Sequence, residues 1–331
     1  MSTKSNTSLN SLNTFSDRLK NIFRSTESGI FLALLIISVL LTIVNPNFAT
    51  SYNLGTLVRQ FSFTTMIAFG QTLVLISAGI DLSVGAVAGL CGILSAWLMV
   101  NTGVDPYLCI IIGVLIGTLC GAMNGFFITK IKLNPFIVTL ATGEIFGGLI
   151  LVITKGWAIT NLPKKVTYLG QGMIGFIPIP VIMMLILAVI FIYILRNTPF
   201  GRYIYAIGGN ESASRLVGVK VNNVKIGVYA ISGCMAAFSG IIFVCRLAAG
   251  QPSVGQNWVM PSVTAAIIGG TSLSGGEGGI LGTVIGAALM GVLSNAIVLL
   301  NVSAYWEKVI IGTVVLLAVV LDRVRAKMNQ N

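Results

Sequence analysis

Ionisable side chains are scarce in this sequence, and three of its nine acids lie inside or between long apolar runs. Glu144 lies ten residues beyond Asn134 in an otherwise apolar run, whereas Asp81 and Glu277 lie in glycine-rich breaks. A carboxyl group within a bilayer is costly, so each is a functional candidate. Glu144 could bind hydroxyl groups of a solute or pair with another helix, and both interpretations stay open. For Asp81 and Glu277 we expect helix capping.

Other chemistry is poorly represented among the residues. The chain has no histidine, and its five cysteines lack the spacing of metal ligands, so no metal site is expected. No GxxxxGK[ST] motif is present, so this chain has no loop of that type for nucleotide phosphates. Without a visible nucleophile–base pair, we expect no enzyme activity and no cofactor.

Composition indicates that a membrane must surround the elements that carry these residues. Hydrophobic residues make up 55% of the chain and charged residues 9%, whereas soluble proteins usually contain about 25% charged residues. Mean hydropathy is +0.94. Apolar runs of roughly 20 residues can cross a bilayer as helices. We predict an all-α, polytopic transmembrane helical bundle of about ten spans, near residues 29–44, 54–78, 83–101, 106–128, 134–154, 177–196, 226–247, 258–273, 279–300 and 304–321.

The basic residues predict the orientation of this bundle. With an even number of spans and the N-terminus inside, 14 of the 20 Lys and Arg residues fall in cytoplasmic segments, as the positive-inside rule expects. Lys155, Lys164 and Lys165 fall on the other side, which makes the 155–176 loop the weak point. Because the basic residues flank apolar runs without interleaved aromatics, we expect membrane lipid, and no nucleic acid, around them.

The predicted organisation has three parts. Residues 1–27 form a flexible cytoplasmic N-terminal arm, and residues 323–331 form a basic cytoplasmic tail. Between them lies a transmembrane domain, 28–322, with a long polar cytoplasmic loop at 197–225. Both termini are therefore expected in the cytoplasm.

The polar loop contains a predicted short helix. Asn210 is a good N-cap, Glu211 suits the positive end of the helix dipole, and Gly218 is expected to end the helix. Ala213, Leu216 and Val217 fall on one face at helical spacing. An apolar face in a basic loop needs a partner surface, either a protein or the lipid interface.

Four segments carry a resemblance to a known family. They are FGRYIYAIGGN at 200–210, GIDLSVG at 79–85, NPFIVTL at 134–140 and GGTSLSGG at 269–276. In the same order and spacing over roughly residues 30–325, they resemble the permeases of ribose-type ABC sugar importers. The resemblance implies a bacterial inner-membrane permease that passes a monosaccharide, with a pentose such as ribose favoured, by alternating access.

The resemblance also implies partners. Such permeases pair with a second permease, identical or different, receive sugar from a periplasmic or lipid-anchored binding protein, and are driven by a separate cytoplasmic ABC ATPase. The residues expected to dock into that ATPase are Gly208, Gly209, Asn210, Glu211, Ala213, Arg215, Leu216 and Gly218. Arg246 and Gln251, at the outer end of a span, are expected to contact the binding protein.

A sugar path needs amide or hydroxyl groups and an aromatic face. The candidates at suitable depth are Phe69, Gln71, Asn124, Glu144 and Asn295, although amide groups also serve helix packing. The sequence departs from the family at 259–264, which lacks the usual acids, and at Glu144, where the family is usually uncharged. These departures leave the sugar unassigned.

Two rival functions remain. One is a branched-chain amino-acid permease of the related ABC type. The residues of the 200–210 motif, which are of the sugar type, argue against it. The other is an ion-coupled secondary transporter in which Glu144 and Asp81 bind protons or sodium. Such a carrier would transport solute alone under an ion gradient, whereas a permease subunit would not.

Overall fold

The computed structural model describes residues 26–303 and, beyond them, residues 306, 308–310, 312–314, 316, 317, 319 and 320. The regular secondary structure of this part is helical except for one hairpin, β1 (Met173–Ile174) paired antiparallel with β2 (Ile177–Pro178), and an isolated bridge between Ile159 and Gly250. The predicted all-α class is therefore confirmed apart from this hairpin. The predicted tail 323–331, and all but the last two residues of the arm 1–27, lie outside the described residues.

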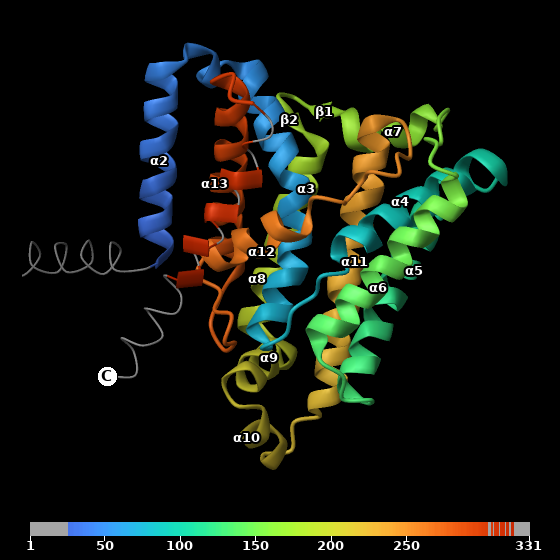
Figure 1. Ribbon diagram of the computed structural model, residues 1–331, viewed down its shortest axis with the longest axis vertical. Helices are drawn as coiled ribbons and strands as arrows, with labels where there is room; N and C mark the ends of the chain where they lie inside the picture. The colour runs from blue at the N-terminus through green and yellow to red at the C-terminus, as the bar shows by residue number, and fades with distance from the viewer. Residues whose placement is uncertain are drawn as a thin grey trace, which may run out of the picture.

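The helices follow one another with short connections (Figure 1). Their bounds are α2 Thr26–Val44, η1 Pro46–Ala49, α3 Ser51–Ile76, α4 Val84–Asn101, α5 Pro106–Thr129, α6 Pro135–Thr154, α7 Lys164–Gln171, α8 Ile179–Asn197, α9 Pro199–Gly209, α10 Glu211–Leu216, α11 Val221–Leu247, α12 Val259–Ile268 and α13 Ile280–Leu299.

Capping side chains explain where several of these helices begin. Asp105 and Asn134 accept hydrogen bonds from backbone N–H groups of the first turns of α5 and α6, and a proline follows each of them. The capping side chain satisfies backbone N–H groups that have no partner within the helix. Proline at the first helical position costs no hydrogen bond, because the N–H group there would have no helical partner. The sequence therefore set these boundaries locally.

Among the residues that the structure describes, six helices are long and apolar enough to cross a membrane: α4, α5, α6, α8, α11 and α13. The surface of α5 shows the environment that they meet, because its exposed large side chains include Ile111, Leu115, Leu119 and Phe126. Large apolar side chains spaced four residues apart form a continuous stripe suited to lipid. The chain is thus a multi-pass membrane protein, and the total of ten spans stays a prediction.

The expected span at 258–273 is wrong as a single crossing helix. Helix α12 has only ten residues, or about 15 Å of helix, which is half the thickness of a bilayer core. It ends at Gly269 because the chain then turns through Gly270, Gly275, Gly276 and Gly278, all with positive φ. The expected span at 304–321 lies partly outside the described residues.

Helix α11 is the centre of the fold. It packs against α3, α4 and α5, and it runs behind α4, α5 and α6 in the view of Figure 1. The contact with α5 is backbone to backbone, since Gly121 lies against the carbonyl group of Tyr229 and Gly233 against that of Gly117. Small residues allow membrane helices to approach this closely.

Because a Cβ atom at Gly121 would overlap the Tyr229 carbonyl oxygen, Gly121→Ala should force α5 and α11 apart. We expect a loss of roughly 1–3 kcal/mol of stability, typical of overpacking, seen as a lower thermal unfolding temperature. Gly148→Ala is the matched control, because nothing lies within 4 Å of its Cβ position on α6. Equal unfolding temperatures for the two variants would contradict this packing.

Candidate functional site: the coupling segment and the broken helices

Three glycine-rich junctions meet at one end of the bundle. The N–H group of Gly276, in the loop after α12, donates to the carbonyl oxygen of Ile76 at the end of α3, at 2.8 Å. Gly208, near the end of α9, packs against both groups so closely that a Cβ atom there would overlap them. The two glycine-rich breaks of the sequence, 78–85 and 274–279, are therefore neighbours, with the end of α9 between them.

Helix α10 forms as the sequence predicts. The Asn210 side chain accepts a hydrogen bond from the Ala213 N–H at 2.9 Å, and Gly218 leaves the helix with φ +86°. Its apolar face points outward: Leu216 is 89% exposed and Val217 79%, and Ala213 is also exposed. Figure 1 shows α10 at the tip of the molecule, beyond the membrane-spanning helices.

Glu211 ties α10 to the next long helix. Its carboxylate contacts Arg215 at 2.7 Å and Lys225 of α11 at 2.6 Å. Partial burial alone would raise the pKa of Glu211, but the hydrogen bonds and charges of Lys225 and Arg215 outweigh it and lower the pKa. Ion pairs therefore hold one side of α10 in place, and its apolar face on the other side stays free.

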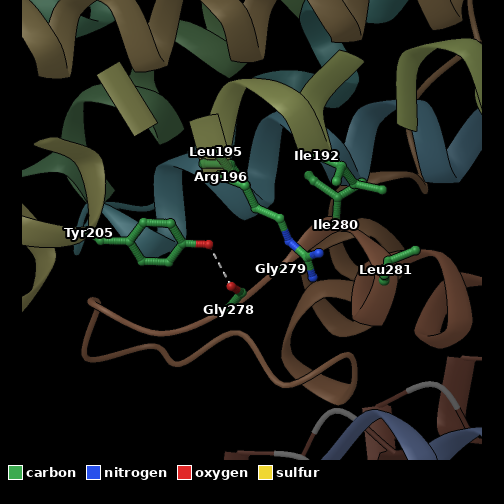
Figure 2. Close-up of a pocket in the computed structure, with 8 residues that line it drawn as sticks. All are labelled: Ile192, Leu195, Arg196, Tyr205, Gly278, Gly279, Ile280 and Leu281. Carbon is green, nitrogen blue, oxygen red and sulfur yellow. Dashed lines mark hydrogen bonds between the residues drawn. The ribbon is translucent and has the colours of Figure 1, made fainter. Parts of the chain in front are cut away.

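A cavity of about 160 Å³ lies between the end of α8, α9 and the start of α13. Figure 2 shows the Tyr205 hydroxyl pointing to the Gly278 carbonyl oxygen, to which it donates at 2.8 Å. In the same view, the guanidinium group of Arg196 reaches over Gly279. Burial raises the pKa of Tyr205, although the nearby Arg196 lowers it in part, so the hydroxyl remains a donor. α9 is thus bonded to the loop that precedes α13.

A buried polar cluster lies at the break between α3 and α4. Asp81 accepts hydrogen bonds from the Ser83 N–H (3.0 Å), the Ser83 hydroxyl (2.6 Å) and the Ser232 hydroxyl (2.8 Å). Gln71 donates to the Asp81 carbonyl oxygen, and Asn124 donates to the Ser83 hydroxyl oxygen. The structure thus brings together two of the predicted path residues, Gln71 and Asn124, inside the fold rather than along an open channel.

The other predicted path residues lie apart from this cluster. Phe69 is buried and its ring contacts that of Phe191. Asn295 exchanges side-chain hydrogen bonds with Asn53 at 2.9 and 3.0 Å, which joins α13 to α3. Glu144 is exposed halfway along α6, on the outer surface of this single chain. Their roles in a path stay predictions.

The two residues predicted to contact a binding protein differ in exposure. Arg246 is held over the rings of Phe63 and Phe243 at 5.7 and 5.8 Å and donates to Gln60, so much of its side chain serves packing. Gln251 is exposed. Only Gln251 therefore offers a free side chain for a partner.

Sequence reasoning missed Ser83, Ser232 and Tyr205. Ser83 lies in the motif GIDLSVG, and that motif could have indicated a functional role for it. Ser232 is one of many small residues in α11, and no sequence pattern singles it out. Tyr205 lies in the 200–210 motif, yet its partner is a backbone carbonyl 73 positions away. Contacts of this kind depend on the tertiary arrangement.

Comparison with known proteins decides the family. A family model described as the permease component of branched-chain amino acid transport systems matches residues 53–319. The chain belongs to this permease family. It is 45% identical to the ribose import permease protein of Bacillus subtilis over 89% of this chain and 92% of the relative, and 40% identical to that of Haemophilus influenzae over 89% and 93%.

Relatives with other sugars in their names are also similar. The D-allose transport system permease protein of Escherichia coli is 38% identical over 90% of this chain and 92% of its own length. The fructose import permease protein of Rhizobium meliloti is 31% identical over 94% and 89%. No solved structure matches the chain. The predicted resemblance to ribose-type permeases is confirmed.

The close packing around Gly208 can be tested by substitution. Gly208→Ala must displace the Ile76 carbonyl or the Gly276 amide, so we expect a stability loss of roughly 1–3 kcal/mol and a lower unfolding temperature. Gly209→Ala is the matched control, because nothing lies within 4 Å of that Cβ position. If Gly208→Ala unfolds no earlier than Gly209→Ala, the junction is not close-packed.

The charges around Glu211 predict that the local stability of residues 211–225 depends on pH. A lowered carboxyl pKa stabilises the folded segment above the unfolded pKa of about 4.3, and this contribution is lost as pH falls through the lower folded pKa. Amide hydrogen exchange in residues 211–225, corrected for the intrinsic rate, should therefore accelerate below about pH 4. Glu211→Gln should exchange faster at neutral pH and lose this acid step; an unchanged acid step in that variant would contradict the role of Glu211.

Proposed function

We propose that this chain is the membrane-spanning permease subunit of an ATP-driven sugar importer. Relatives named as ribose, allose and fructose permeases support the sugar class. The chain itself is a transport subunit, and ATP hydrolysis belongs to a separate cytoplasmic ABC ATPase. We favour a pentose such as ribose, because the ribose permeases share 38–45% identity with this chain.

The observation that carries the proposal is the exposed apolar face of α10. Leu216 and Val217 extend from the tip of the molecule, where burial in a partner would recover about 25 cal/mol for each Å² of apolar surface. α10 is bonded to α11 through Glu211, and the preceding helix α9 is packed against both helix breaks through Gly208. A push on α10 by the ATPase would therefore reach the membrane helices directly.

The proposed topology has ten crossings of the bacterial inner membrane, with α12 and the glycine-rich loop after it counted as one crossing, and both termini in the cytoplasm. Figure 1 supports it in part: α2 begins toward the end of the bundle where α9 and α10 lie, while α7 and the β1–β2 hairpin lie at the opposite end. Lys164 and Lys165 are in α7, so they face the periplasm in this topology. They are the exceptions to the positive-inside rule that the sequence indicated.

The proposed substrate path lies between this chain and a second permease. Glu144 is exposed on α6, a helix whose other exposed residues are apolar or small, and a carboxyl group facing lipid would be costly. A second permease, identical or different, would cover it and form a path in which the carboxyl group binds sugar hydroxyls. Gln251, exposed after α11, would contact the sugar-binding protein on the periplasmic side.

A branched-chain amino-acid permease is the second candidate function. The family model that matches carries that description, so family membership alone does not select the substrate. The proposal for sugar depends on the relatives. ATP-dependent uptake of labelled pentoses, hexoses and branched-chain amino acids separates the two, and uptake of amino acids alone would overturn the sugar assignment.

The importer itself is tested by purifying the tagged chain from its native membrane. We expect an ATPase and a second permease to co-purify, with ATP hydrolysis stimulated by a sugar-loaded binding protein. A chain that purifies without an ATPase, and that moves solute under an ion gradient, would overturn the proposal in favour of a secondary carrier.

The docking surface is tested by Leu216→Asp. A carboxylate buried against the ATPase without a partner is costly, so we expect at least a tenfold weaker association, measured by pull-down of the ATPase with the purified permease, and an unchanged unfolding temperature. Ser212→Asp introduces the same charge at an exposed position of α10 outside the trio Ala213, Leu216 and Val217 and should weaken association less. Equal effects of the two variants would contradict docking through this face.

A further inference from the structure

The break between α3 and α4 holds a carboxyl group with no charged partner. Asp81 is 1% exposed and, within the described part of the chain, forms no ion pair. Its hydrogen bonds all run inward, from the Ser83 N–H and the Ser83 and Ser232 hydroxyls. Three donors and two carboxyl oxygens suit the ionised form, and a buried ion without a counter-charge is strongly unfavourable.

Two further oxygen atoms in the cluster lack hydrogen-bond partners. Gln71 and Asn124 are fully buried, and the Oε1 and Oδ1 atoms of their amides receive no donor. Each amide nitrogen is bound to the cluster, Gln71 to the Asp81 carbonyl and Asn124 to the Ser83 hydroxyl. In each amide the oxygen and the nitrogen are bonded to the same carbon atom. Each unpartnered oxygen is therefore only one amide group away from the cluster atom that its nitrogen contacts.

Proton accounting fixes these orientations while Asp81 is ionised. A backbone carbonyl can only accept, so Gln71 must present its nitrogen to Asp81. The Ser83 hydroxyl has one proton and gives it to the Asp81 carboxylate, so Asn124 must also present its nitrogen. Turning either amide over would remove one hydrogen bond, and the two acceptors therefore remain unsatisfied by the protein.

We propose that this cluster binds a monovalent cation, Na⁺ in the first instance, through the oxygens of Asp81, Gln71, Asn124, Ser83 and Ser232. Hard cations take carboxylate, amide carbonyl and hydroxyl oxygens, and helix breaks in transporters offer such sites. One carboxylate balances one positive charge, and no group of three acidic, cysteine or histidine side chains exists among the described residues to favour a divalent ion. The cation would hold α3, α5 and α11 together around the break.

The site is distinct from cation-coupled transport and independent of the proposed sugar function. It is enclosed by α3, α5 and α11, so in this proposal the ion stabilises the fold and does not travel with the solute. ATP-driven uptake can therefore fail while the cation still binds, and the two proposals are distinguishable.

The test uses the full-length chain in lipid nanodiscs, with Na⁺, K⁺ or Li⁺ replacing choline at constant ionic strength. We expect a saturable rise of the unfolding temperature with Na⁺, of roughly 5 °C at about a hundredfold excess over the dissociation constant. Equilibrium binding of radioactive ²²Na⁺ to the wild-type protein should saturate at about one ion per chain, a readout that needs no variant.

Asp81→Asn should abolish both the thermal shift and ²²Na⁺ binding, because it removes the charge and preserves the shape. Thr283→Val is the matched control: it breaks a buried hydroxyl pair with Thr72 at 2.7 Å outside the cluster and should lower stability but retain the Na⁺ shift. If Asp81→Asn fails to fold, Gln71→Leu and Asn124→Leu serve in its place, and each should weaken ²²Na⁺ binding.

Two results would overturn the proposal. One is a wild-type protein that binds no ²²Na⁺ and shows no shift with any of the three cations. The other is an unfolding temperature that rises on acidification in choline buffer and not with Na⁺, which would mean that Asp81 is protonated. Tyr229, whose hydroxyl donates to the Ile80 carbonyl at 3.1 Å, is the other titratable group at the break, so Tyr229→Phe separates its contribution.

Discussion

Helix breaks inside an apolar fold expose backbone groups that must find partners within the protein, and the rest of this structure depends on how they do so. The carbonyl of Ile76 is bonded to the Gly276 amide, that of Ile80 to Tyr229, that of Asp81 to Gln71 and that of Gly278 to Tyr205. A buried backbone group of this kind has to be satisfied by another part of the protein. Because the partners of Ile76, Ile80 and Gly278 come from other elements, each break is also a joint between elements.

These joints connect the segment formed by α9 and α10 to the membrane helices. Helix α9 is attached to both breaks, by close packing at Gly208 and by the Tyr205 hydrogen bond. The short helix α10 follows it and is tied to α11 through Glu211. Interfaces that are close-packed transmit displacement because they cannot absorb it. α10 is therefore linked through these contacts to α3, α11 and the loop before α13.

The outer surface divides into faces with different partners. Helix α5 presents a stripe of large apolar side chains, as expected against lipid, whereas α6 presents Glu144 next to exposed Ala141 and Gly148. α10 presents three apolar residues beyond the membrane-spanning part. Lipid suits the first face and does not suit the second, since it would leave a carboxyl group unsolvated on α6.

The sequence by itself determined the class of fold, most helix boundaries and the short helix of the polar loop at 197–225. These depend on local quantities: apolar runs, capping residues such as Asn134 and Asn210, and the stop at Gly218. It also indicated the family, since four motifs kept their order. It did not reveal that α12 stops after ten residues, because an apolar run of that composition satisfies a hydropathy pattern whether or not the chain turns.

Only the tertiary structure decided which residues meet. Gln71, Asp81, Asn124 and Ser232 come from segments up to 161 positions apart, and packing of α11 against α3 and α5 brings them into one cluster. It also placed Asn295 against Asn53 and turned Glu144 outward. A hydrogen-bond partner is set by the rotation and distance of helices around one another, and those depend on glycine contacts such as Gly121 with Tyr229, which no local pattern encodes.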